Sequence, residues 1–194
     1  MLAERGCWII VPNLGNSWMN DQAVAALDKI IDQMCKSETI DPARVHLIGT
    51  SMGAGSGLIY VSLRPKKIRS VCALFPMTDF NTWMKETPRF APSIIQAYGS
   101  DPTKVTPVLD SRSPIWNAEA FRNVPVYLLH GDNDNIVPPH HSRDFAVALR
   151  AKRCDVTYHE VPGFGHDDQI AEAFQREIAD FLTKETRLKN TTKR

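Results

Sequence analysis

Ser51 stands at the centre of a pentapeptide, GTSMG at 49–53, that has the form G-x-S-x-G. An apolar run that predicts a strand over 45–48 precedes it, and a segment that can form a helix over 52–63 follows it. A sharp turn between strand and helix exposes the serine hydroxyl, and glycine on both sides avoids collisions with neighbouring backbone. The pattern predicts that Ser51 is a nucleophile and that the amide of Met52 stabilises an oxyanion. A plain strand-to-helix turn is the alternative interpretation.

A serine hydroxyl attacks a carbonyl efficiently only when a base takes its proton, so a histidine is expected nearby. His166 directly follows the run Gly163-Phe164-Gly165, in a loop between the last predicted strand and the last predicted helix, and is the predicted base. A helix-start histidine is the alternative. The other histidines are expected to have structural roles: His46 and His159 within strands, His130 at a strand end, and His140 and His141 as an exposed pair. Such a pair is weak evidence for a metal, and we predict no metal site.

The third member of the set should be a carboxylate that orients the imidazole. Asp132 and Asp134 both follow the strand that ends at His130. Their spacing alone does not choose between them. Because side chains activate the nucleophile, this chemistry needs no cofactor.

Alternating strands and helices must position these residues. Short apolar runs predict strands over 8–11, 45–48, 70–75, 126–130 and 156–161. Apolar residues at helical spacing predict helices over 24–34, 52–63 and 142–150, and a last helix carrying Ile170, Phe174, Ile178 and Phe181. The alternation is typical of an α/β fold with a mainly parallel sheet and helices on both faces.

The segment 76–121 interrupts this alternation with six prolines and scattered aromatic residues. Long irregular segments in compact domains are often lids or binding loops, so we expect this one to wall a substrate pocket. A surface excursion is the alternative. We expect one catalytic domain over 1–185 and a basic tail over 186–194.

Composition limits the possible partners. The 194 residues are 43% hydrophobic, and 23 basic against 22 acidic side chains give a net charge of +1. Neither nucleic acid nor a membrane is therefore expected as a partner, and no apolar run reaches the roughly 18 residues of a span. The four cysteines form no C-x-x-C pair, so we expect buried free thiols. The protein is expected to be cytoplasmic if Met1 is the true start and secreted if a signal peptide precedes it.

Three motifs carry a resemblance to a known group. The G-x-S-x-G turn, the H-G-x-x-D-x-x-V-P run at 130–138 and the G-x-G-H run at 163–166 resemble the α/β-hydrolase superfamily. They are most similar to its prolyl-oligopeptidase and acetyl-esterase branch. The resemblance covers residues 6–182 and implies an α/β-hydrolase fold. It also implies that Asp134 is the catalytic acid and that Asp132 shapes the loop.

One part of the family pattern has no counterpart before Ser51. Family members have a histidine- and glycine-rich loop whose amide supplies a second oxyanion donor. We therefore expect the chain to be truncated at its N-terminus relative to the family, as a piece of a longer protein. The family's third strand would lie between 8–11 and 45–48. Without the missing donor, the rate would fall by about two to three orders of magnitude.

The expected function is that of a serine hydrolase that cleaves a carboxylic ester through an acyl-enzyme. A small-molecule ester or short peptide is the expected substrate. A serine peptidase of the prolyl-oligopeptidase type is the alternative, placed second because no propeller-like repeats are visible. A non-catalytic relic of the fold is the third interpretation.

Overall fold

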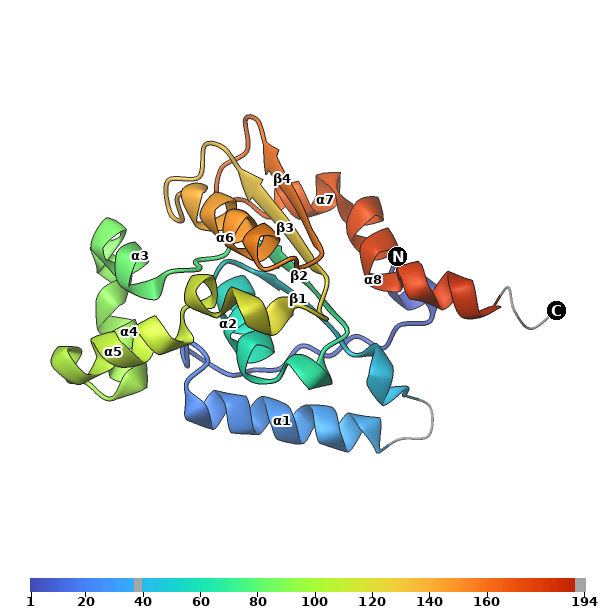
Figure 1. Cartoon of the computed structure of the whole chain (residues 1–194), viewed down its shortest axis with the longest axis horizontal. Helices are drawn as coiled ribbons and strands as arrows, with labels where there is room; N and C mark the ends of the chain where they lie inside the picture. The colour runs from blue at the N-terminus through green and yellow to red at the C-terminus, as the bar shows by residue number, and fades with distance from the viewer. Residues whose placement is uncertain (37–39, 191–194) are drawn as a thin grey trace.

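The computed structural model, which describes residues 1–36 and 40–190, is built around a four-stranded parallel sheet (Figure 1). The strands are β1 (His46–Thr50), β2 (Ser70–Leu74), β3 (Val126–Gly131) and β4 (Val156–Val161), and they lie in that order. Each pairs in parallel with the next. The predicted parallel sheet is confirmed, and all four carboxyl ends lie at one edge.

The two central strands divide the interior into two apolar cores. Val71 and Ala73 of β2 face one core, whereas Cys72 and Leu74 face the other, and residues of β3 alternate in the same way. Helices α2 (Ser51–Leu63) and α6 (His140–Ala151) cover the first face; α7 (Gln169–Ala173) and α8 (Gln175–Asn190) cover the second (Figure 1). The predicted helices on both faces are confirmed.

Helix α1 (Asp21–Cys35) packs outside α2. The Asn20 side chain accepts a hydrogen bond from the amide of Ala23 and so caps the helix. Tyr60 and Arg64, at the end of α2, both donate to Asp28 of α1. Short 3-10 helices complete this half of the chain: η1 (Ala3–Arg5), η2 (Pro42–Arg44) and η3 (Pro65–Lys67).

The segment 76–121 is helical, so the prediction that it is irregular is wrong. It contains α3 (Phe80–Glu86), η4 (Pro88–Phe90), α4 (Ala91–Tyr98), α5 (Pro102–Arg112) and η5 (Pro114–Phe121). Four of its prolines lie in the first turn of a helix, where the missing N–H needs no partner. Asp79 and Asp101 cap α3 and α5. These four prolines thus mark the starts of helices, and Pro107 lies within α5.

Two predicted elements differ in the structure. Residues 8–11 pair with no strand among the described residues and therefore form no strand, and their apolar side chains are exposed. β1 is thus an edge strand that pairs only with β2 in the described part of the chain. The predicted last helix is interrupted at Phe174, which separates α7 from α8. Helix α8 extends to Asn190, through the first residues of the expected tail, and 191–194 lie outside the described residues.

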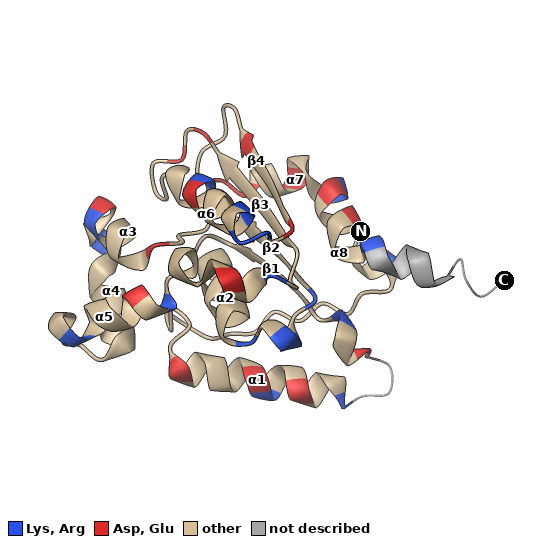
Figure 2. Ribbon diagram, viewed as in Figure 1, with Lys and Arg blue, Asp and Glu red and all other residues tan. Residues whose placement is uncertain are grey.

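The distribution of charged residues agrees with the nearly equal numbers of basic and acidic side chains in the sequence. Figure 2 shows both signs of charge along α1, α6 and α8. Within the described residues, no helix combines the length and the apolar character needed to cross a membrane. Cys72 and Cys154 are buried as expected, whereas Cys7 and Cys35 are partly exposed.

Candidate active site

Ser51 occupies the turn between β1 and α2 with a left-handed backbone, φ 50°. A side chain at Gly49 would place its Cβ 2.5 Å from the carbonyl carbon of Gly53, so glycine is required there. A Cβ at Gly53 would meet nothing within 4 Å. The expectation that both glycines avoid a collision is therefore right for Gly49 and wrong for Gly53, which is itself the obstacle.

The structure brings the three predicted residues together. Nε2 of His166 lies 2.8 Å from Oγ of Ser51, and Nδ1 of His166 lies 2.7 Å from Oδ2 of Asp134. Ser51 follows β1, Asp134 follows β3 and His166 follows β4, so parallel strands deliver all three to one edge of the sheet. A hydroxyl, an imidazole and a carboxylate in this chain of contacts can perform nucleophilic acyl transfer.

Asp134 is buried but fully hydrogen-bonded. Its Oδ1 accepts from the amides of Ile136 and Val137, both at 2.9 Å, and its Oδ2 also lies 3.3 Å from Nε2 of His130. Burial alone would raise the pKa of this carboxyl, but the hydrogen bonds from His130, His166 and the two amides outweigh it and lower the pKa. Asp134 is therefore an anion beside the imidazole.

Asp132 performs a different task, the one expected for it. Its Oδ1 accepts from the amide of Gly163 at 2.8 Å and so ties the Asp134 loop to the His166 loop. The two loops also touch at Gly131, where a Cβ would collide with the carbonyl of Phe164. The sequence analysis missed this requirement, because the only local signal is a glycine after a histidine.

Phe75 is a second residue that the sequence analysis missed. It directly follows β2, has a left-handed φ of 41°, and its ring centroid lies 4.5 Å from that of His166. The two rings are tilted against each other at 60°, so Phe75 packs directly on the imidazole. Its position at the end of a central strand is the only signal in the sequence.

Met52 lies in the first turn of α2, where amides have no partner within the helix. An amide at this place can bind a developing negative charge. Its role as an oxyanion donor stays a prediction.

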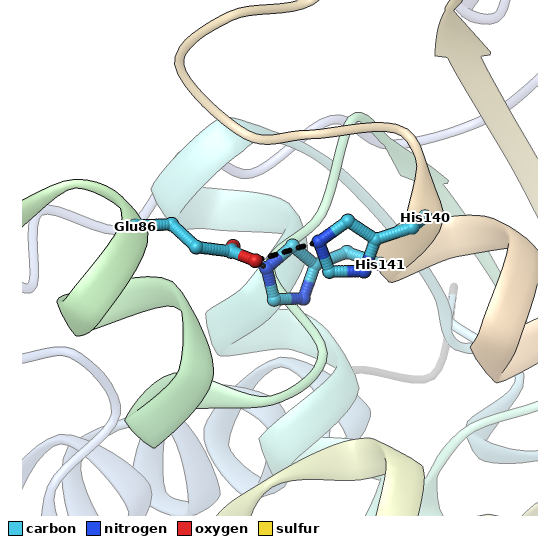
Figure 3. Close-up of side chains that lie close together, drawn as sticks. All are labelled: Glu86, His140 and His141. Atoms are coloured by element: carbon cyan, nitrogen blue, oxygen red, sulfur yellow. Dashed lines mark hydrogen bonds and ion pairs between the residues drawn. The ribbon is translucent and has the colours of Figure 1, made fainter.

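Glu86, His140 and His141 are the one group of three potential metal ligands among the described residues (Figure 3). His141 is buried, so its predicted exposure is wrong, because both ring nitrogens are covered by hydrogen-bond partners from 78–86. Its Nδ1 accepts from the amides of Thr78 and Asp79, each at 3.4 Å, which leaves its proton on Nε2. That proton points to Glu86, and a metal would require a free lone pair there. Hydrogen bonding accounts for the group better than metal binding.

Comparison with known proteins agrees with this fold. The sequence pattern of the prolyl oligopeptidase family matches residues 10–189. The "Alpha/beta hydrolase domain-containing protein WAV2" of Arabidopsis thaliana is 27% identical over 161 residues, which are 79% of this chain and 51% of that protein.

Two solved structures show the same fold. A puromycin-hydrolysing peptidase of Mycobacterium tuberculosis has a TM-score of 0.71 and 24% identity, over 87% of this chain and 26% of its own. The acylaminoacyl peptidase of Pyrococcus horikoshii has a TM-score of 0.67 and 15% identity, over 79% of this chain and 25% of its own.

The parallel sheet, with a G-x-S-x-G turn between its first strand and the following helix, defines an α/β hydrolase. Within that class the chain belongs to the prolyl oligopeptidase family, and the resemblance seen in the sequence is confirmed. The chain spans about half the length of the curated relative and about a quarter of the two solved chains.

Proposed function

We propose that this chain is the catalytic part of a serine hydrolase that forms an acyl-enzyme on Ser51. The observation that supports it most is the pair of contacts of His166, 2.8 Å to Ser51 Oγ and 2.7 Å to Asp134 Oδ2. His166 takes the hydroxyl proton as Ser51 attacks the carbonyl carbon, and then gives that proton to the leaving group. Water then attacks the acyl-enzyme, with His166 again taking the proton, and this step releases the carboxylic acid and restores the Ser51 hydroxyl.

Asp134 orients the imidazole and stabilises the cation that forms in the transition state. The lowered pKa of Asp134 supports this role, since the carboxylate stays charged near neutral pH. The amide of Met52 is the proposed donor to the oxyanion, aided by the positive end of α2.

The proposed substrate is a carboxylic ester, with a peptide bond as the second candidate. Membership of the prolyl oligopeptidase family favours the peptide. An alcohol leaves more easily than an amine, so a site that cleaves amides should also cleave esters of the same acyl group. Ester cleavage is therefore the expected shared activity, and amide cleavage distinguishes the peptidase.

The helical segment 76–121 is the proposed lid or pocket wall of a single catalytic domain over 1–185. A cluster of aromatic rings supports its attachment to the body of the domain, since Trp18 contacts Phe80, Trp83 and Phe90. A small ester or a short peptide would be bound between this segment and Ser51.

A fluorophosphonate probe tests the proposal, because it reacts with serine hydroxyls that a base activates. We expect one adduct per chain, located on Ser51 by mass spectrometry and absent in Ser51→Ala. His166→Ala should remove labelling while the fold remains. Folded wild-type protein that acquires no adduct would instead favour a non-catalytic relic.

Matched substrates then separate the two candidates. An ester and an anilide that share one acyl group should both be hydrolysed by a peptidase, and only the ester by an esterase. The Ser51→Ala variant provides the background rate for both substrates.

A further inference from the structure

Residues at the end of α3 form hydrogen bonds with the loop that carries Asp134. Nε1 of Trp83 donates to the carbonyl of Ile136 at 2.8 Å, and the hydroxyl of Thr87 donates to the same oxygen at 3.0 Å. We name these two residues and Glu86 the α3 clamp. Trp83 is almost fully buried, so its indole is held firmly in place.

The carbonyl of Ile136 belongs to the peptide group whose N–H binds Asp134. The group joining Ile136 to Val137 presents its oxygen to Trp83 and Thr87, and its N–H donates to Oδ1 of Asp134 at 2.9 Å. A peptide group is planar, so fixing its oxygen also fixes the direction of its N–H. Donors on the oxygen also polarise the N–H and strengthen the bond that it donates.

Glu86 fastens the other end of this loop. Its Oε1 accepts from Nε2 of His140 at 2.8 Å, and its Oε2 accepts from Nε2 of His141 at 3.0 Å (Figure 3). Both histidines begin α6, directly after the loop. Residues 135–139 are therefore held by α3 at both ends, although α3 belongs to the segment 76–121.

We propose that the α3 clamp positions Asp134 through the peptide group between Ile136 and Val137. The inference rests on the proposed function and extends it. The three residues of the clamp are positioning residues, because they act on Asp134 through the loop and do not touch the reacting atoms. The segment 76–121 thus supports the catalytic acid in addition to any role as a pocket wall.

Thr87→Val tests the inference, because it removes the hydroxyl and nearly keeps the shape of the side chain. We expect the rate of fluorophosphonate labelling and the kcat for an ester to fall about three- to tenfold, as for the loss of one hydrogen bond. KM should stay within about twofold, since substrate contacts are unchanged. Thr87→Ser, which keeps the hydroxyl, should restore the wild-type rate.

Thr103→Val is the matched control, because Thr103 also donates a hydroxyl within the same segment, but to Asp101 on the surface. It should leave labelling unchanged. A folded Thr87→Val protein that labels as fast as the wild type would overturn the inference and leave the proposed function intact. Equal losses in Thr87→Val and Thr87→Ser would also overturn it.

A second measurement does not depend on activity. The proton on Nδ1 of His166, held between imidazole and carboxylate, should give a low-field signal in proton NMR, and Thr87→Val should shift or weaken it. Wild-type protein that is not labelled would contradict the proposed function. Whether or not the wild type is labelled, a low-field NMR signal that is the same in Thr87→Val as in the wild type would contradict the inference.

Discussion

At the scale of single residues, the backbone around Ser51 distinguishes its two flanking glycines. A methyl group at Gly49 would lie 2.5 to 2.7 Å from backbone atoms of Gly53 and Ala54, and no rotation of a side chain can relieve this. We expect Gly49→Ala to destabilise the fold by about 1–3 kcal/mol, as overpacking does. Denaturant unfolding measures this loss, and fluorophosphonate labelling should be greatly slowed.

Gly53→Ala is the control, since the space beside Gly53 is open. In a helix, alanine is more favourable than glycine by up to about 1 kcal/mol, so this variant should be as stable as the wild type or more stable. Equal stability of the two variants would contradict the steric explanation.

At the scale of elements, one carboxylate joins α1 to α2. Asp28 accepts from the hydroxyl of Tyr60 at 2.9 Å, and Tyr60 is fully buried. Asp28→Ala would leave that hydroxyl without its acceptor, so we expect a loss of about 1–3 kcal/mol in the free energy of unfolding. Asp28→Asn keeps an oxygen for Tyr60 and should lose less. If both variants lose equally, the ion pairs with Arg64 and Lys67 matter more than the buried bond.

The sequence predicted those elements whose pattern is local. The four strands of the sheet and the helices at 24–34, 52–63 and 142–150 follow from apolar spacing, and the residues at the carboxyl ends of the strands converge because the strands are parallel. The helices within 76–121 were hidden because prolines at helix starts look like breaks.

Contacts between distant segments were not predictable in this way. The contact of Phe75 with His166, the approach of Gly131 to Phe164 and the clamp of Thr87 on Ile136 each join residues far apart in the chain. The segment 8–11 has the composition of a strand, but a strand requires a neighbour to pair with.

At the scale of the whole molecule, apolar side chains are exposed both in the segment 8–11 and on the edge strand β1. Trp8 and Val11 are 70% and 88% exposed, and Ile48 on the edge strand β1 is 51% exposed. Unpaired edges and apolar patches favour association. We expect this chain to self-associate as its concentration rises, as measured by analytical ultracentrifugation.

Val11→Lys combined with Ile48→Lys should shift that association to higher concentrations, because charges at an edge oppose pairing. Val147→Lys, at an exposed apolar position on α6, is the control and should have little effect. Wild-type protein that sediments as a monomer at every concentration would disprove the prediction.

The hydrogen bonds from Trp83 and Thr87 to the carbonyl of Ile136 limit how this chain can be redesigned. The segment 76–121 connects β2 to β3, which are neighbours in the sheet. It can therefore be exchanged as a unit for a segment from another protein in order to change substrate preference. A donor cassette without equivalents of Trp83 and Thr87 would bring its own pocket and withdraw support from the acid. Chimeras should therefore be designed with the junction placed after Thr87, so that the graft changes selectivity and retains turnover.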